Sequence, residues 1–194
     1  MILIHEIYGI NDHMKSVIYH FDKVGFEVYC PHLLGKVKNF PYVSENEAYD
    51  YFMNKVDFDE SVKIVLNVAK ELKTKNALRD IFLIGFSVGA TIAWRCSQYN
   101  KLFTGVIGFY GSRIRDYVHL APACKTLLFF PKIEASFNPL EIAEILKKKD
   151  NLCVRIVEGK HGFADPYSTA FHAESKNSCF QEIDDFIKMC LLEE

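Results

Sequence analysis

Short apolar runs alternate along the chain with segments in which apolar residues recur every three or four positions. The runs have no polar face, which is typical of strands buried on both sides of a parallel sheet. The periodic segments predict amphipathic helices between the runs. The predicted strands cover residues 1–4, 26–30, 81–84, 104–110, 126–130 and 152–157. Alternating strands and helices predict an α/β fold: a three-layer α/β/α sandwich around a mostly parallel, doubly wound sheet of about six strands.

Capping residues mark where several helices begin. Asn11 or Asp12 can cap a helix after the first strand, and Asn138 precedes a proline suited to a first helical turn. Ser44 and Glu47 have the spacing of a capping box. Between the second strand and this box we expect a long loop over residues 32–43.

The topology predicts where a ligand binds. Right-handed crossovers favour the strand order 2-1-3-4-5-6, so the order reverses between the first and third strands. Open α/β sheets bind ligands beyond the carboxyl ends of the strands at such a reversal. Glu6 and Ile7 follow the first strand, and Ser87 follows the third. We therefore expect these residues to face each other across one crevice.

Composition narrows the classes of partner and the compartment. A chain of 194 residues with 49% hydrophobic residues predicts one domain over residues 1–194. A net charge of −2 does not favour nucleic acid or an anionic membrane as partner. No apolar run approaches the ~20 residues of a membrane span. The six cysteines form no C-x-x-C pair and no export signal precedes them, so we expect reduced thiols and a cytoplasmic location. The sequence does not decide between a monomer and a homodimer as the oligomeric state.

The run of residues 80–90 contains the pattern Gly85-Phe-Ser87-Val-Gly89 between a predicted strand and a predicted helix. A sharp strand-to-helix turn of this kind exposes a serine hydroxyl, and the helix directs its positive dipole end toward it. A Cβ at Gly85 or Gly89 would strike neighbouring backbone. An ordinary turn that happens to contain serine is the alternative interpretation.

A serine hydroxyl needs a base to become nucleophilic. His161 follows the last predicted strand, where a base belongs in the chain order serine, acid, histidine, and Gly162 lets the loop turn tightly. By contrast, His13, His20 and His172 fall in helix-like segments, and we interpret them as surface groups.

The motifs together resemble the dienelactone hydrolase family of α/β hydrolases. The matching segments occur in family order from the first strand to the histidine loop: Glu6–Asn11, Gly25–Phe26, Pro31 with Leu33, Gly85–Gly89, Phe109–Gly111 and His161–Phe163. The resemblance implies hydrolysis of a carboxylic ester or lactone by a nucleophile–histidine–acid triad, with Ser87 and His161 as two members. It implies no metal and no organic cofactor.

The third triad member departs from the family pattern. The family has an aspartate after the fifth strand, and Glu134 occupies the matching position here. Glutamate can orient an imidazole as aspartate does, although its extra methylene shifts the geometry. Asp116, after the preceding strand, is the alternative acid. A third interpretation makes Glu134 a solvated loop charge.

The resemblance also suggests residues for the pocket. We expect the backbone N–H groups of Ile7 and Val88 to form an oxyanion hole. Glu6, Tyr8 and His32 are candidate substrate contacts, with a structural role as the alternative for His32. A buried carboxylate such as Glu6 is costly unless it is paired. In the family the matching glutamate interacts with the nucleophile, typically a cysteine, so Glu6 could hydrogen-bond Ser87 here.

Two functions follow from this sequence. The first is a serine hydrolase that cleaves small esters, lactones or thioesters through an acyl-enzyme, because no long insertion exists to form a lid over a large substrate. The second is a non-catalytic family member that binds a small ligand or a protein partner in the same pocket.

Overall fold

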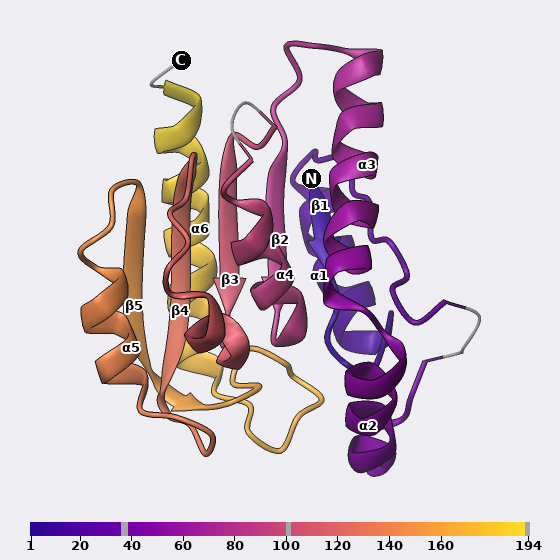
Figure 1. Cartoon of the computed structure of the whole chain (residues 1–194), viewed down its shortest axis with the longest axis vertical. Helices are drawn as coiled ribbons and strands as arrows, with labels where there is room; N and C mark the ends of the chain where they lie inside the picture. The colour runs from indigo at the N-terminus through magenta and orange to yellow at the C-terminus, as the bar shows by residue number, and fades with distance from the viewer. Residues whose placement is uncertain (36–38, 100–101, 193–194) are drawn as a thin grey trace.

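The computed structural model describes residues 1–35, 39–99 and 102–192. Within these residues five parallel strands form one sheet in the order β1-β2-β3-β4-β5 (Figure 1). The strands are β1 (Ile2–Ile4), β2 (Phe82–Phe86), β3 (Gly105–Phe109), β4 (Lys125–Ile133) and β5 (Leu152–Lys160). Because all five run in one direction, their carboxyl ends meet at one edge of the sheet, the lower edge in Figure 1.

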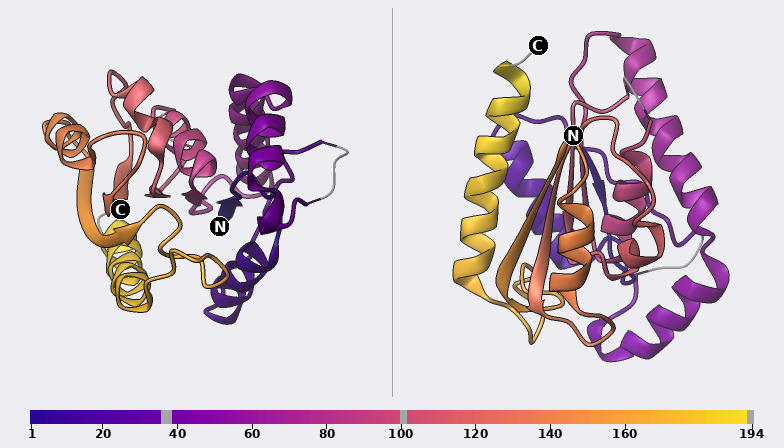
Figure 2. Two further views of the ribbon diagram at one scale, coloured as in Figure 1. Left: turned by 90° about the horizontal axis from the view of Figure 1, so that it is seen from below. Right: turned by 60° about the vertical axis from the view of Figure 1, so that its left-hand side comes forward.

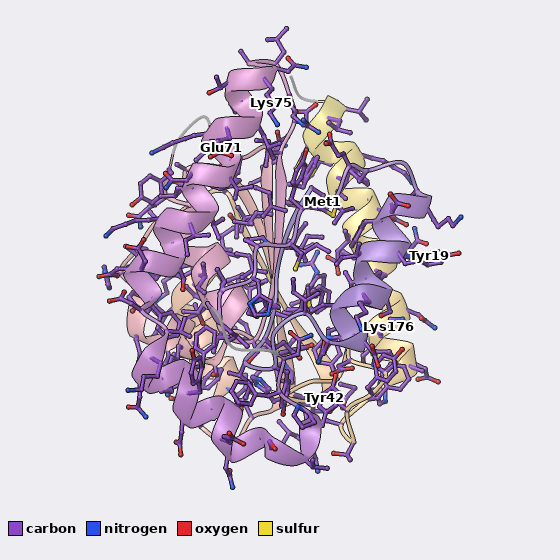
Figure 3. The ribbon with its side chains drawn as sticks, turned by 90° about the vertical axis from the view of Figure 1, so that its right-hand side faces the viewer. Met1, Tyr19, Tyr42, Glu71, Lys75 and Lys176 are labelled. Carbon is purple, nitrogen blue, oxygen red and sulfur yellow. The ribbon has the colours of Figure 1, made fainter. Side chains whose placement is uncertain are left out.

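Helices cover both faces of the sheet and confirm the predicted three-layer sandwich (Figure 2). One face carries α1 (Asp12–Lys23) and α6 (Ala173–Leu192). The other carries α3 (Phe58–Lys75), α4 (Val88–Cys96) and α5 (Pro139–Leu146), while α2 (Glu45–Lys55) lies beyond the carboxyl ends of the strands. Seen edge-on, the sheet lies between α3 and α1, and Tyr42 lies near its lower end (Figure 3). Two 3-10 turns, η1 (Tyr42–Ser44) and η2 (Ser112–Tyr117), complete the elements.

Apolar side chains fill both spaces between the sheet and the helices. Ile2 and Leu83 pack on the α3 and α4 side, while Leu3 and Ile84 pack on the α1 and α6 side. All four are fully buried. Successive strand residues point to opposite faces, so a strand covered on both faces needs a continuous apolar run. This explains why the strands are recognisable in the sequence.

The predicted strand at residues 26–30 is only a single bridge. Tyr29 pairs with Ile2, through hydrogen bonds from Leu3 N–H to the Tyr29 carbonyl (2.7 Å) and from Tyr29 N–H to the Met1 carbonyl (2.9 Å). Pro31, which follows two residues later, lacks an N–H and so limits further pairing. The segment still lies beside β1, as predicted, but the sheet has five strands rather than six.

The helix caps agree with the sequence except at Ser44. The Asn11 side chain accepts a hydrogen bond from Met14 N–H, and that of Asn138 accepts from Leu140 N–H. Ser44 makes no side-chain cap, because it is the last residue of η1 and continues directly into α2. The loop predicted over residues 32–43 includes residues 36–38, which lie outside the described residues.

None of the described helices combines the length and the apolar character that crossing a lipid bilayer requires.

Candidate active site

The turn between β2 and α4 holds Ser87 in an unusual backbone conformation. Its φ of 54° and ψ of −117° lie outside the regions that residues with a side chain normally adopt. A hydrogen bond from Ser87 N–H to the Phe109 carbonyl (2.9 Å) fastens the turn to β3. Such strain costs about 1–3 kcal/mol and persists only where the surroundings enforce it. The result is a serine at the tip of a rigid elbow, as the sequence pattern predicts.

The two glycines of the motif allow this close packing. A Cβ at Gly85 would lie 2.1 Å from the Gly89 carbonyl oxygen, and a Cβ at Gly89 would lie 2.4 Å from the Ile4 carbonyl oxygen. Both distances are shorter than any van der Waals contact, and the atoms met are backbone atoms that cannot move aside. The predicted need for glycine at both positions is confirmed.

Ser87, His161 and Glu134 form a connected chain of hydrogen bonds. The Ser87 Oγ lies 2.9 Å from His161 Nε2, and His161 Nδ1 lies 2.8 Å from Glu134 Oε2. A carboxylate only accepts hydrogen bonds, so Nδ1 carries the proton and Nε2 is left to accept from the serine hydroxyl. This is the tautomer in which the histidine can take a proton from serine. Gly162, with φ of +85°, makes the turn that follows His161.

Glu134 owes its position to the end of β4. This strand is longer than the sequence predicts and reaches Ile133, after a shift in its register with β5 that begins at Pro131. Such irregularities redirect the side chains that follow them. The Glu134 side chain is 6% exposed. Burial alone would raise the pKa of this carboxyl group, but the hydrogen bond and positive charge of His161 outweigh burial and lower it.

Asp116, the alternative acid, lies elsewhere. Its carboxylate is 3.2 Å from an Arg113 nitrogen, and its side chain is 44% exposed. Of the two candidate acids in the described structure, Glu134 is therefore the one in contact with His161. It is a buried, hydrogen-bonded group rather than a solvated loop charge.

A cavity of about 750 Å³ opens beside the serine. Ile7 and Val88 line it, and neither donates its backbone N–H to an acceptor among the described residues. Val88 is the first residue of α4, where an N–H has no partner within the helix. Tyr8 also lines the cavity, with its ring 4.7 Å from that of Tyr42. The lining of this cavity therefore includes most of the site residues predicted from the sequence.

His32 is the exception, because it is absent from the described cavity lining. Its Nε2 lies 3.2 Å from Asn39 Oδ1, and its ring packs against His5. His5 itself is fully buried: it accepts a hydrogen bond from Leu33 N–H at 2.8 Å and contacts the Glu6 carbonyl at 2.6 Å. The contacts of His5 and His32 hold the loop after residue 31 against the end of β1.

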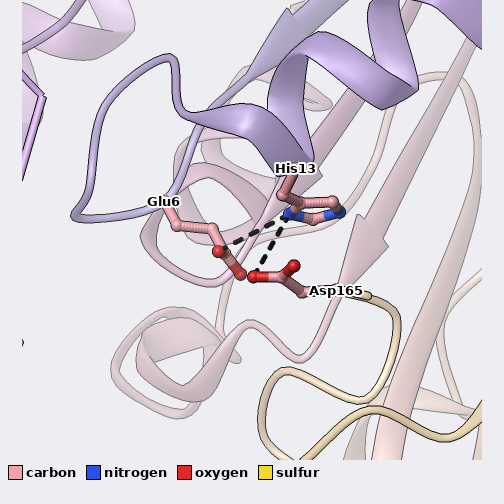
Figure 4. A group of neighbouring side chains, drawn as sticks. All are labelled: Glu6, His13 and Asp165. Atoms are coloured by element: carbon pink, nitrogen blue, oxygen red, sulfur yellow. Dashed lines mark ion pairs between the residues drawn. The ribbon is translucent and has the colours of Figure 1, made fainter. Parts of the chain in front are cut away.

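The sequence interpretation misses a buried cluster next to the triad. His13 is fully buried rather than a surface residue, and it lies between Glu6 and Asp165 (Figure 4). Glu6 makes no hydrogen bond to Ser87 within the described structure; its Oε2 lies 3.7 Å from His13 Nδ1 instead. One sequence signal exists, since His13 is four residues before the buried Val17 and so shares its helix face. Asp165 gives no comparable signal.

Comparisons with known proteins identify the family of this chain. The sequence pattern of the dienelactone hydrolase family matches residues 1–191. The chain is 41% identical over 174 residues to the uncharacterized protein YczH of Bacillus subtilis strain 168, an alignment that covers 89% of this chain and 84% of that protein. It is 22% identical over 206 residues to a Yersinia pestis protein provisionally named a carboxymethylenebutenolidase, covering 96% of this chain and 76% of the relative.

A solved structure shows the same fold. It is a crystal structure from Klebsiella pneumoniae subsp. pneumoniae MGH 78578, provisionally named a dienelactone hydrolase, with a TM-score of 0.77 at 17% identity. The alignment covers 94% of this chain and 83% of that one. The parallel sheet, the serine elbow after β2 and the histidine after β5 define the class of an α/β hydrolase. Within that class, the chain belongs to the dienelactone hydrolase family.

Proposed function

We propose that this hydrolase cleaves small carboxylic esters or lactones through an acyl-enzyme formed on Ser87. The observation that carries the proposal is the unbroken chain of hydrogen bonds from Ser87 Oγ through His161 to Glu134, with lengths of 2.9 and 2.8 Å. A nucleophile in contact with a base, and a base oriented by a carboxylate, is the arrangement that acyl transfer to serine requires.

In the first half of the reaction the Ser87 oxygen attacks the carbonyl carbon of the ester. Its O–H bond breaks, and the proton moves to His161 Nε2. The former carbonyl oxygen becomes an oxyanion, which accepts hydrogen bonds from the N–H groups of Ile7 and Val88. When the intermediate collapses, the carbon–oxygen bond to the alcohol breaks, and the alcohol oxygen takes the proton from Nε2. Glu134 stabilises the transient imidazolium and holds the ring in place.

In the second half a water molecule replaces the alcohol. His161 Nε2 accepts a proton from this water as its oxygen attacks the acyl carbon. The second intermediate collapses by breaking the bond to Ser87, whose oxygen regains a proton from Nε2. An ester yields an acid and an alcohol, whereas a lactone yields one hydroxy acid.

Two observations support a small substrate. The cavity of about 750 Å³ is of the size that encloses a small molecule. The Yersinia pestis relative is provisionally named for the hydrolysis of a butenolide, which is a lactone.

The test is the hydrolysis of p-nitrophenyl acetate and of a simple lactone by the parent protein and by Ser87→Ala. Removing the nucleophile should lower kcat by up to ~10⁶, as in other serine triads. Ser178→Ala is the matched control, because Ser178 is exposed on α6. Equal rates for Ser87→Ala and the parent would show that Ser87 is not the nucleophile.

A further inference from the structure

Three buried side chains meet beside the triad without forming hydrogen bonds to one another. His13 Nδ1 lies 3.7 Å from Glu6 Oε2 and 3.8 Å from Asp165 Oδ2, and Figure 4 shows both carboxylates directed toward that nitrogen. One donor atom from each of the three residues falls within 4.8 Å of the others. A direct N–H···O hydrogen bond measures about 2.9 Å. The three groups thus lie close together, but His13 Nδ1 is farther from both carboxylate oxygens than a hydrogen bond allows.

The spacing fits a shared cation. A zinc ion bonds to imidazole nitrogen and carboxylate oxygen at about 2.1 Å, which places two ligand atoms of a tetrahedral site about 3.4 Å apart. The observed separations of 3.7 and 3.8 Å are closer to this value than to a hydrogen bond. Movements of a few tenths of an ångström would bring His13 Nδ1 to this separation from each of the two carboxylate oxygens.

His13 supplies a second, independent observation. Its side chain is 1% exposed, and neither ring nitrogen has a hydrogen-bond partner among the described residues. Leaving a buried polar group without a hydrogen-bond partner is energetically costly. Its Nδ1 is directed at the two carboxylates, so a cation between them would satisfy this nitrogen.

The negative charges of the two carboxylates also favour a bound cation. Glu6 and Asp165 are both buried, and two carboxylates this close repel each other. A divalent ion would neutralise both carboxylates.

Outer groups hold one of the carboxylates in place. The Tyr42 hydroxyl donates to Asp165 Oδ2 at 2.5 Å, and Asn11 Nδ2 donates to the Tyr42 oxygen at 2.8 Å. Tyr167 N–H donates to the other carboxylate oxygen, Oδ1, at 2.8 Å. Metal sites typically carry such an outer shell, which fixes the ligands in orientation.

We propose that Glu6, His13 and Asp165 form a binding site for one divalent transition-metal ion, with Zn²⁺ as the representative ion. One nitrogen and two oxygen ligands suit Zn²⁺, whereas Mg²⁺ prefers oxygen ligands alone. Glu6 and Asp165 line the cavity, so the ion reaches the site from the cavity and keeps a coordination position open toward it. This site is separate from the Ser87 triad, and the proposal does not depend on the triad being catalytic.

Calorimetric titration of chelator-treated, metal-free protein with Zn²⁺ tests the proposal. We expect one ion per chain and no comparable binding of Mg²⁺. His13→Gln should abolish this binding. Tyr42→Phe, which keeps the ring but removes the hydroxyl that orients Asp165, should weaken it by about 10–100-fold. His119→Gln, which removes an exposed histidine, is the matched control and should bind like the parent.

Two results with variants would overturn the site. One is unchanged Zn²⁺ binding by His13→Gln; the other is binding that His161→Gln abolishes, which would place the ion at the triad. A parent protein without saturable binding below about 1 mM would overturn it as well. If His13→Gln does not fold, an anomalous scattering map of parent crystals soaked in Zn²⁺ gives the answer: a peak enclosed by the three side chains supports the site, and peaks only elsewhere contradict it.

Discussion

Two histidines near the same cavity are each flanked by acidic side chains, but their contacts differ. His161 makes hydrogen-bond contacts through both ring nitrogens, at 2.9 and 2.8 Å. His13 is 3.7 and 3.8 Å from its two carboxylates and makes no hydrogen bond within the described structure. The His161 side chain is 38% exposed, whereas that of His13 is 1% exposed.

The difference separates two kinds of chemistry. Hydrogen bonds to opposite sides of a ring fix its tautomer and orientation, and partial exposure lets substrate and water reach it, so His161 suits proton transfer. His13 has two acidic neighbours on one side of its ring, a geometry that suits ion binding. Position relative to the strands explains the contrast: His161 directly follows β5, whereas His13 is in the first turn of α1.

The largest expected effect is the loss of the His161 base. His161→Ala should lower kcat for p-nitrophenyl acetate by ~10⁶, because Ser87 then has no proton acceptor. Triad residues act as a unit, so the double variant Ser87→Ala, His161→Ala should be no slower than either single variant. Steady-state kinetics measure both effects. A double variant slower than both singles by a further large factor would show that the two residues act separately.

A smaller loss is expected from the acid. Glu134→Gln keeps the size of the side chain but presents an amide to His161 Nδ1, so kcat should fall by roughly 10²–10⁴ with the fold intact. Asp116→Asn, the control, should be within a few-fold of the parent, because Asp116 pairs with Arg113 away from the ring. If the two variants had equal activity, Glu134 would have no role in orienting His161.

The smallest expected effect concerns a third histidine, His5. Burial lowers the pKa of His5 from 6.5 to about 4. Between these values the unfolded chain binds a proton that the folded chain does not, so the free energy of unfolding falls as the pH falls from 6.5 to 4. The loss should reach about 3 kcal/mol at the lower end of this window.

Urea unfolding at several pH values measures this effect. His5→Asn removes the titrating group, so its free energy of unfolding should fall less steeply below pH 6.5 than that of the parent. The exposed His119 offers the control, and His119→Gln should keep the steep dependence. Parallel curves for the parent and His5→Asn would contradict the buried, uncharged state of His5.

The sequence predicts the parts of this structure that depend on local pattern. Continuous apolar runs identify β2 and β3 because these strands are buried on both faces. The chain order and the strand ends predict the positions of Ser87 and His161. The role of Glu134 could be predicted only from the resemblance to a family, because its contact with His161 depends on how β4 and β5 pair.

Long-range packing accounts for what the sequence does not predict. Asp165 is 152 residues away from His13 in the chain, and only the folded structure brings the two side chains together. The segment around Tyr29 has a strand-like composition, but it pairs with β1 only at the single bridge between Tyr29 and Ile2. In both cases the outcome depends on a distant neighbour rather than on the local pattern.

Covalent labelling with a fluorophosphonate tests most directly whether Ser87 is the nucleophile. Mass spectrometry of the intact protein and of its peptides measures the labelling. A nucleophilic serine attacks the phosphorus of this probe and expels fluoride, so we expect one adduct per chain, on the peptide that contains Ser87. Ser87→Ala should carry no adduct, and His161→Ala should label far more slowly. An unlabelled parent protein, or equal labelling of Ser87→Ala, would contradict the assignment of Ser87 as the nucleophile.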